Sequence, residues 1–165
     1  MSSKESSQYT YRVAIIISSD RCSRGEQEDL SGPLIRDMVT AVGFQVVSLT
    51  VLPDEQPLLE AKLKQLCDTY TADLILTSGG TGFSPRDVMP ESTLAVAERL
   101  VPGISEAIRG RSLGINPRAM LSRAVSVIRK DTLIINLPGS PNAVRESLEY
   151  IMGSLRHGLD MLTDR

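Results

Sequence analysis

Cysteine and histidine are scarce in this chain of 165 residues, which contains two cysteines and one histidine. Cys22 and Cys67 can form only one disulfide and lack the spacing of metal ligands, which favours a reduced compartment. His157 lies on a predicted helix near the end of the sequence, where a surface or packing role is typical. The sequence therefore favours neither a structural zinc site nor a histidine-activated nucleophile.

Long apolar runs and an excess of positive charge are also missing. The longest apolar runs span about five residues, far less than a membrane span requires. The formal net charge is −2, and two Phe and four Tyr provide no aromatic platform for nucleic acid. Residues 1–9 lack the hydrophobic region of a signal peptide. These absences predict a cytoplasmic protein that binds neither nucleic acid nor a membrane.

The composition is that of an ordinary globular domain. Hydrophobic residues make up 41% and charged residues 23% of the chain, whose length is sufficient for one full core. We expect residues 1–10 to form a disordered tail, because they are polar and terminal. Residues 11–165 are expected to fold as a single domain.

Apolar strand patterns alternate with helical patterns along the chain. The continuous β-branched run at residues 13–17 is typical of a central strand that is covered on both faces. A link of only three residues, 129–131, joins the last two predicted strands and favours an antiparallel hairpin. The sequence thus predicts an α/β fold with a mostly parallel central sheet, helices on both faces and a short antiparallel hairpin. Predicted strands cover residues 13–17, 44–52, 74–76, 124–128 and 132–136, and predicted helices begin near Ser31, Pro57, Pro90, Ile104 and Pro141.

Local signals predict where some helices begin and end. Ser31 is expected to cap the first long helix, and Gly43 to end it. The helix after Pro90 is expected to continue toward Leu100, up to the break at Pro102. Residues 21–29 read as a charged loop, and residues 110–120 have no clear pattern.

The first candidate for a functional site is the glycine-rich turn at residues 78–82 (SGGTG). It follows a buried strand and precedes a helix, and its exposed backbone N–H groups suit a phosphate. The alternative is a tight connection without function. A second turn, residues 138–142, has the same setting before the last helix, with Ser140 as a cap and Pro141 at the first helical position. Ligands of parallel sheets bind at the carboxyl ends of strands, where both turns are expected.

Neither turn is a known nucleotide loop. No Gly-Lys-Ser/Thr follows, no lysine lies in either turn, and the glycine spacing differs from the dinucleotide pattern. Phosphate binding must then come from backbone N–H groups, hydroxyl groups and nearby arginines. Arg86 and Arg123 are the candidates, since a guanidinium binds phosphate with two hydrogen bonds. The alternative is that both are solvated surface arginines.

Two aspartates share a local context that admits two interpretations. Asp54 and Asp87 each lie three residues before a proline at a predicted helix start. Aspartate is a favoured helix cap, which is the plain interpretation. In the functional interpretation both carboxylates reach the same crevice and hold Mg²⁺ together with substrate phosphates. Their position beside a glycine-rich turn favours the functional interpretation.

Together, these motifs resemble the molybdopterin adenylyltransferase family, which includes bacterial molybdenum-cofactor proteins and the G domain of gephyrin. The resemblance covers nearly the whole chain, with the motifs in matching order. The end of the first predicted strand departs from the family, where Val-Ser-Asp is more usual than Ser18-Ser19-Asp20. The matching segments are residues 78–82 (SGGTG), 85–87 (PRD), 90–91 (PE), 121–123 (LSR) and 137–139 (LPG).

The resemblance implies a three-layer α/β/α domain, typically in a homotrimer, that transfers the adenylyl group of Mg²⁺-ATP to molybdopterin. Asp54 and Asp87 match the catalytic acids, and both would bind the metal. Ser122 matches a serine tied to molybdopterin, and we expect Asp20, Arg86 and Arg123 to contact the substrate as well. The matched nucleotide-binding residues are Gly79, Gly80, Thr81, Gly82, Pro138, Gly139 and Ser140.

A second hypothesis stays open beside catalysis, namely a molybdopterin-binding or scaffolding trimer without activity. Retention of Asp54 and Asp87 favours the enzyme. A molybdenum-insertion protein is the expected partner, because it would use the adenylylated product. Insertion of molybdate by this chain itself is disfavoured, since that activity usually belongs to a larger multidomain protein.

Overall fold

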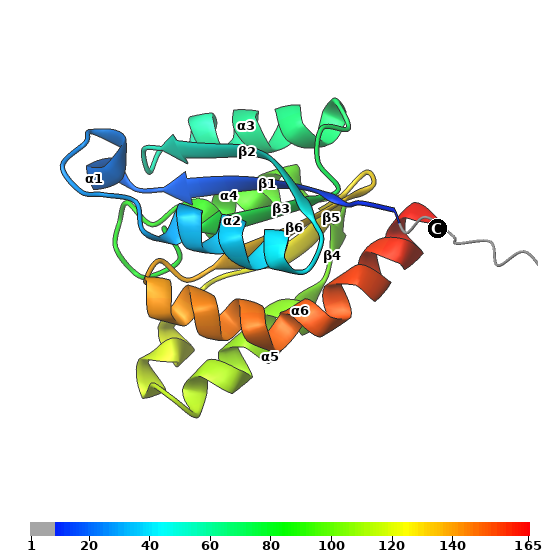
Figure 1. The fold of residues 1–165 in the computed structure, drawn as a ribbon. Helices are drawn as coiled ribbons and strands as arrows, with labels where there is room; N and C mark the ends of the chain where they lie inside the picture. Colours follow the sequence, from blue (N-terminus) through cyan, green and yellow to red (C-terminus); the bar gives the residue numbers. More distant parts are fainter. Residues whose placement is uncertain (1–8) are drawn as a thin grey trace, which may run out of the picture.

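A six-stranded sheet with helices on both faces forms the framework of residues 9–165, the part of the chain that the computed structural model describes (Figure 1). The strand order is β2-β1-β3-β6-β5-β4, and β2, β1, β3 and β6 run parallel to one another. The last pairs, β6–β5 and β5–β4, are antiparallel. The strands are β1 (Arg12–Ser18), β2 (Gln45–Leu52), β3 (Leu74–Ser78), β4 (Arg99–Leu100), β5 (Ser126–Arg129) and β6 (Thr132–Leu137). The helices are α1 (Asp20–Ser23), α2 (Ser31–Ala41), α3 (Gln56–Asp68), α4 (Met89–Val96), α5 (Pro102–Leu113) and α6 (Pro141–Thr163), with a 3₁₀ helix η1 (Pro117–Leu121).

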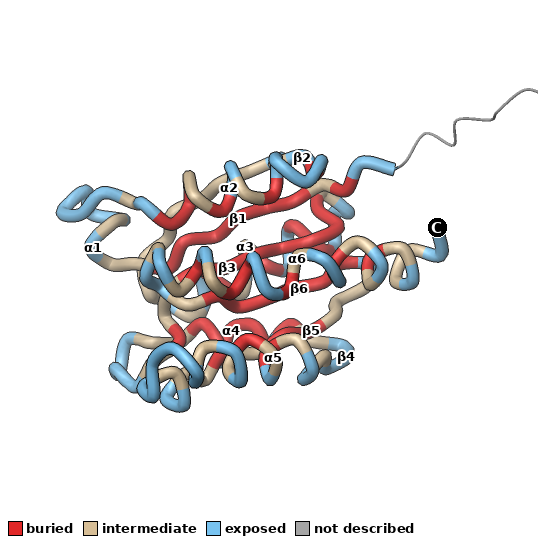
Figure 2. Tube along the Cα trace, turned by 60° about the horizontal axis from the view of Figure 1, so that its bottom comes forward, coloured by how far each residue is buried: buried red, intermediate tan, exposed pale blue. Residues whose placement is uncertain are grey.

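Two hydrophobic cores, one on each face of the sheet, make this a three-layer α/β/α fold. Alternate residues of β1 point to opposite faces, as a strand requires. Ile15 packs with α2, α5 and α6, whereas Ile16 packs with α3 and α4. The central strands β1, β3 and β6 are buried, whereas β2 is half-buried, the short edge strand β4 is exposed and the outer faces of the helices are exposed (Figure 2). The predicted fold class, with its mostly parallel sheet and β5–β6 hairpin, is confirmed.

The parallel strands bring the ends of β1, β2, β3 and β6 to one edge of the sheet. Ser18 pairs with Leu52, and Ser78 pairs with Leu137. This carboxyl edge lies on the left of Figure 1, beside α1. Both glycine-rich turns leave strands there, as the sequence predicts.

Two local expectations are wrong, and a third is wrong in part. Ser31 does not cap α2, because its hydroxyl group donates to the carbonyl of Gly139 (3.0 Å) while Asp29 accepts the N–H of Gly32 (2.9 Å). The helix after Pro90 ends at Val96 and does not reach Leu100, which forms β4 by pairing with β5. The loop 21–29 begins with a helical turn, α1.

Other local expectations are confirmed. Gly43 follows α2 with a left-handed φ of +87°, and Ser140 caps α6 by accepting the N–H of Ala143 (3.3 Å). The stretch 110–120, for which the sequence shows no clear pattern, contains the end of α5 and most of η1.

Both cysteines are free, and burial raises the pKa of the Cys67 thiol to about 11, so this thiol packs as a small apolar side chain.

Most of the predicted N-terminal tail lies outside the described residues, which begin at Tyr9. The Tyr9 ring packs against Tyr11 (5.0 Å between ring centroids) and under the guanidinium of Arg165 (3.8 Å). Within residues 9–165, no helix combines the length and the apolar character that crossing a membrane requires.

An ion pair at the opposite edge of the sheet joins β1 to the start of β3. Asp73 accepts hydrogen bonds from the backbone N–H (2.8 Å), Nε (3.1 Å) and Nη2 (2.9 Å) of Arg12. Burial alone raises the pKa of Asp73, but these hydrogen bonds outweigh it and hold the pKa below its ordinary value. The ionised carboxylate therefore stabilises the fold.

We predict that Asp73→Asn lowers the free energy of unfolding by about 1–3 kcal/mol at neutral pH, because the donors of Arg12 lose a charged acceptor. The pKa of Asp73 is lowered by folding, so its contribution is present above the unfolded pKa and is lost as the pH falls through the folded pKa. Urea unfolding at neutral pH and in this acidic range measures both effects. Asp37→Asn, which changes an exposed carboxylate on α2, is the control and should change the stability little. An equal loss in both variants would contradict the prediction.

Candidate functional site

The two glycine-rich turns lie against each other at the carboxyl edge of the sheet. The Ser78 hydroxyl group donates to the carbonyl of Pro138 (2.7 Å), so the end of β3 is tied to the turn after β6. A Cβ added to Gly139 would lie 3.5 Å from the Cα of Gly79. Two turns that are distant in the sequence thus form one continuous surface.

Glycine is required in the first turn for two separate reasons. Gly79 and Gly80 have left-handed φ angles of +95° and +67°, which residues with a side chain rarely adopt. A Cβ on Gly79 would also overlap the carbonyl oxygen of Ser18. The turn can therefore lie flat against the end of β1.

Asp54 points at this turn and is held by the end of β1. Its Oδ1 accepts the hydroxyl proton of Ser18 (2.5 Å), and its Oδ2 accepts the backbone N–H of Asp20 (2.9 Å). A Cβ on Gly80 would lie 3.3 Å from Oδ1. Helix α3 begins after Glu55 without a side-chain cap, so Asp54 is not the helix cap that the plain interpretation required.

Asp87 lies at the other end of the same turn. Its Oδ2 accepts the backbone N–H of Ser84 (2.9 Å) and would lie 2.9 Å from a Cβ on Gly82. Helix α4 begins after Val88, again without a side-chain cap. Asp54 at Gly80 and Asp87 at Gly82 therefore flank the turn, and neither caps a helix.

Asp20, which follows β1, and Arg86, which follows β3, form an ion pair with each other. Nε and Nη2 of Arg86 donate to the two carboxylate oxygens of Asp20, both at 2.9 Å. These bonds, together with the backbone N–H of Asp54, lower the pKa of Asp20 to about 2. The pair joins the segment after β1 to the segment after β3.

Arg123 holds the loop between the turn and α4. Its guanidinium donates to the carbonyl groups of Gly82 and Asp87, both at 2.7 Å, and pairs with Glu91. Its backbone N–H donates to the carbonyl of Thr81 (2.9 Å). The ion pair with Arg123 lowers the pKa of Glu91. Arg123 thus binds the chain itself in this structure, and its predicted contact with substrate stays a prediction.

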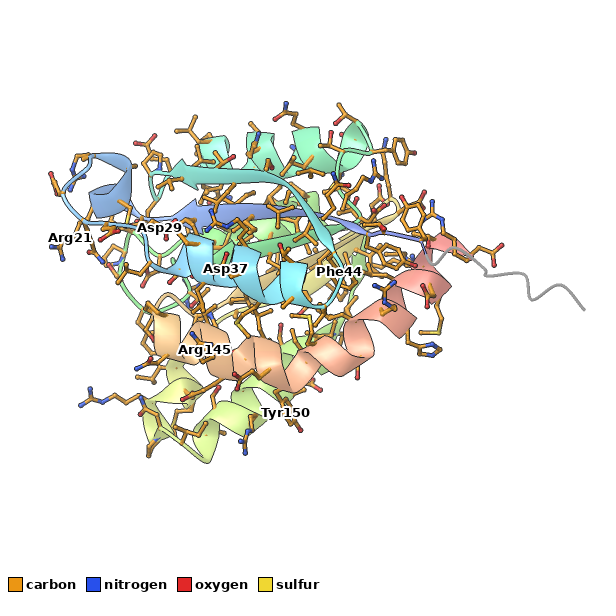
Figure 3. All side chains as sticks on the ribbon, in the orientation of Figure 1. Arg21, Asp29, Asp37, Phe44, Arg145 and Tyr150 are labelled. Carbon is orange, nitrogen blue, oxygen red and sulfur yellow. The ribbon has the colours of Figure 1, made fainter. Side chains whose placement is uncertain are left out.

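The turns separate two cavities. One, of about 180 Å³, lies toward α1 and α2, and the other, of about 260 Å³, lies toward α5 and η1. Asp29 and Arg21 mark the side of α1 in Figure 3. The lining of the first includes Ser18, Cys22, Asp29, Gly79 and Gly139, and that of the second Thr81, Gly82, Arg109, Arg118, Ser122 and Pro138.

The structure brings the predicted site residues together at one edge of the sheet. Ser122, which is distant in sequence from the first turn, lines the second cavity beside Thr81 and Gly82. Ser140 lies in the second turn, where its hydroxyl group caps α6. The roles of the individual residues toward a ligand stay predictions.

The sequence patterns described above do not identify a group of buried polar residues that joins the elements carrying the first turn. Asn136 in β6 donates to the hydroxyl groups of Thr77 (3.0 Å) and Thr93 (2.9 Å), and all three are fully buried. Its Oδ1 accepts the N–H of Val125 (3.2 Å). This cluster joins β3, β6 and α4 under the turn. The sequence contains a signal for this cluster, because Asn136 interrupts an apolar strand and a buried amide needs hydrogen-bond partners.

Asp54 and Asp87 have the chemistry that a magnesium ion requires. Within residues 9–165, no three His, Cys, Asp or Glu side chains converge as a complete metal site. Magnesium is commonly held by one or two carboxylates while substrate phosphates and water complete its coordination. Two carboxylates beside a turn of free backbone N–H groups fit such an ion when it arrives with a nucleotide.

The fold and the candidate site define a class, an α/β domain whose candidate ligand site lies at the carboxyl ends of parallel strands. Residues 14–157 match the family described as "Probable molybdopterin binding domain". The chain belongs to this family of molybdopterin-binding domains.

Proteins similar to this chain agree with that assignment. It is 38% identical over 155 residues to the molybdopterin adenylyltransferase of Helicobacter pylori strain J99, covering 93% of this chain and 88% of that protein. It is 44% identical over 144 residues to the molybdopterin adenylyltransferase of Escherichia coli K12, covering 86% and 74%. The structure of the molybdopterin biosynthesis enzyme MoaB of Thermus thermophilus superimposes with a TM-score of 0.89 at 42% identity, covering 94% of this chain and 98% of that one.

We predict that Gly79→Ala destabilises the protein by about 3 kcal/mol, because the new methyl group combines backbone strain with overlap on Ser18. Gly25→Ala is the matched control, since Gly25 also has a positive φ (+72°) but a Cβ added there would have no atom within 4 Å. The control should lose only about 1–2 kcal/mol, the cost of the left-handed backbone. Thermal and urea unfolding measure the difference. Equal losses would show that the close approach to Ser18 is unimportant.

Proposed function

We propose that this chain transfers the adenylyl group of Mg²⁺-ATP to molybdopterin and so produces adenylylated molybdopterin and pyrophosphate. The observation that carries the proposal is the position of Asp54 and Asp87, which flank a glycine-rich turn between two cavities. The relatives named molybdopterin adenylyltransferase support the same reaction.

The reaction needs no nucleophile from the protein. A phosphate oxygen of molybdopterin attacks the α-phosphorus of ATP, the new P–O bond forms, and the bond to pyrophosphate breaks. Negative charge accumulates on phosphoryl oxygens, so catalysis rests on positioning and on electrostatic stabilisation. Backbone N–H groups of residues 79–82 and 139–140 supply fixed dipoles for these oxygens, which explains why the turns contain no lysine.

Asp54 and Asp87 would hold the magnesium ion. When bound, magnesium neutralises charge on the phosphates and on the leaving pyrophosphate. The hydrogen bonds of Asp54 to Ser18 and Asp20 keep its carboxylate aimed at the turn. Asp87 is similarly oriented by the N–H of Ser84.

The two cavities suit two substrates. In the proposed arrangement the nucleotide contacts both turns, and molybdopterin contacts Ser122 in the second cavity. Arg109 and Arg118 add positive charge to that cavity, which favours a phosphorylated ligand. The expected setting is the cytoplasm, where a molybdenum-insertion protein would use the product.

We further propose that the chain forms a homotrimer. Several large apolar side chains between residues 94 and 121 are exposed, which is typical of an association surface. Leu100, 65% exposed on the short edge strand β4, is an example. The others are Leu94, Leu113, Ile115, Met120 and Leu121.

Asp87→Ala should reduce formation of adenylylated molybdopterin by at least about 100-fold, because one of the two carboxylates for the metal is lost. Molybdopterin binding should change little, since Asp87 lies outside the lining of the second cavity named above. The measurement is formation of pyrophosphate from Mg²⁺-ATP with purified molybdopterin. Asp37→Ala on α2 is the control and should keep full activity. Unchanged turnover in Asp87→Ala would rule out the assigned role.

The melting temperature distinguishes the enzyme from a binding or scaffolding protein. At about 100 times its Kd, Mg²⁺-ATP should stabilise the wild-type fold by about 2.7 kcal/mol. Asp54→Ala should weaken this stabilisation, because it removes a carboxylate for the metal. No shift for the wild type at millimolar Mg²⁺-ATP would favour the binding protein over the enzyme.

The trimer can be tested by light scattering after size exclusion. We expect a mass of about three times the 18.0 kDa of one chain. Leu100→Glu should lower this mass, because a charge at a buried apolar contact opposes association. Tyr150→Glu, which changes an exposed side chain on α6 outside residues 94–121, is the control. A monomeric wild type, or equal dissociation of both variants, would contradict the proposal.

A further inference from the structure

The carboxylate of Asp20 contacts both segments that carry the proposed catalytic acids. Its Oδ1 accepts the backbone N–H of Asp54 (3.0 Å), and the backbone N–H of Asp20 donates in return to Oδ2 of Asp54 (2.9 Å). This reciprocal pair closes a ring of hydrogen bonds between the ends of β1 and β2. A neighbouring bond from the N–H of Ser19 to the carbonyl of Leu52 (2.9 Å) extends the same connection.

The same carboxylate reaches the other acid through Arg86. The guanidinium of Arg86 binds both oxygens of Asp20, and Asp87 is the next residue in the chain. Two parallel N–H···O bonds fix the direction of the guanidinium as well as its distance. Asp20 therefore sets the position of the backbone at residue 54 and restrains the loop at residue 87.

The contacts of Asp20 indicate a positioning role and not direct contact with substrate. Both carboxylate oxygens of Asp20 accept from groups of the chain, and its side chain is only 21% exposed. Its negative charge is matched by Arg86, so it does not repel the phosphates of a nucleotide as an unpaired carboxylate would.

We propose that Asp20 is a positioning residue, which acts on the reaction through Asp54 and Arg86 and not by touching the substrate. This inference rests on the proposed adenylyl transfer. It replaces the expectation that Asp20 and Arg86 bind substrate with a role in fixing the distance between the two catalytic carboxylates. A misplacement of about 1 Å can cost about 100-fold in rate, so a small relaxation of this connection is sufficient for a large effect.

The kinetic test uses single and double variants. Asp20→Ala should lower kcat by about 100-fold while the KM values for ATP and molybdopterin change by less than about threefold. Arg86→Ala should lower kcat by about tenfold, and the double variant should lie within about twofold of Asp20→Ala, because both act through one connection. Asp20→Asn keeps one acceptor for the N–H of Asp54 and should have an intermediate kcat. A raised KM with unchanged kcat, or losses that multiply in the double variant, would overturn the proposal.

The chain offers a matched control at the opposite edge of the sheet. Asp68, at the end of α3, accepts two hydrogen bonds from the guanidinium of Arg129 (2.8 and 2.9 Å), the same arrangement as Asp20 with Arg86. In each pair one partner is exposed (Arg86 and Asp68), and ion pairs with a solvent-exposed partner contribute little to stability. Asp68→Asn and Asp20→Asn should therefore have similar melting temperatures, whereas only Asp20→Asn should lose activity. Equal kcat in the two variants would overturn the proposal.

A measurement without substrates separates this inference from the proposed function. In amide hydrogen exchange, Asp20→Ala should increase the exchange rate of the Asp54 N–H by about tenfold, and Asp68→Asn should leave it unchanged. If the wild type transfers no adenylyl group, the proposed function fails, but the exchange result still shows whether Asp20 positions Asp54. Unchanged exchange in Asp20→Ala would overturn the positioning role whatever the activity.

Discussion

The contact between the backbone of Gly79 and the carbonyl of Ser18 is the constraint on which the site depends. The left-handed turn can approach the end of β1 only because no Cβ lies between them. This approach brings the turn within reach of Asp54, which the hydroxyl group of the same Ser18 orients. The second turn then packs against Gly79 and is fixed by the hydroxyl group of Ser78. One close backbone contact thus places an acid, two turns and the walls of two cavities.

The rest of the fold holds this edge of the sheet in place. Parallel pairing of four strands brings their ends together, and buried hydrogen bonds of Asn136 join β3 and β6 directly beneath the turn. Arg123 fixes the loop that carries Asp87 by binding its carbonyl groups. Such a scaffold suits a reaction in which the two substrates supply the reacting groups and the protein supplies position and fixed charge.

Sequence patterns could predict the architecture because each strand signal is local. The apolar run at 13–17 is sufficient to predict a buried parallel strand, and the short link at 129–131 is sufficient to predict a hairpin. The small strand β4 could not be predicted, since Arg99 and Leu100 form it only by pairing with β5, which lies more than twenty residues later. For the same reason local rules wrongly predict that Ser31 caps α2. The carbonyl that its hydroxyl group contacts, that of Gly139, is distant in sequence.

Sequence patterns select residues that the fold brings to one edge of the sheet, but they do not reveal how these residues are connected. Glycine spacing and the two aspartates indicated an anion site, and the family resemblance indicated its chemistry. The connection from Asp20 to Asp54 and Arg86 depends on three strand ends meeting in space, which no local rule contains. Helix-capping rules predict a cap at Asp54 and at Asp87, but neither residue caps a helix: Asp54 binds the end of β1, and Asp87 accepts the N–H of Ser84 in its own loop.

The central claim is that the adenylyl group passes directly between substrates that this chain positions, without a covalent intermediate on the protein. A single-turnover experiment with ATP labelled at the α-phosphorus, Mg²⁺ and purified molybdopterin tests it most directly. The account predicts that the label moves from ATP to molybdopterin and that denatured protein carries none at any time. Label bound to the protein, or label that stays in ATP while molybdopterin is present, would contradict it.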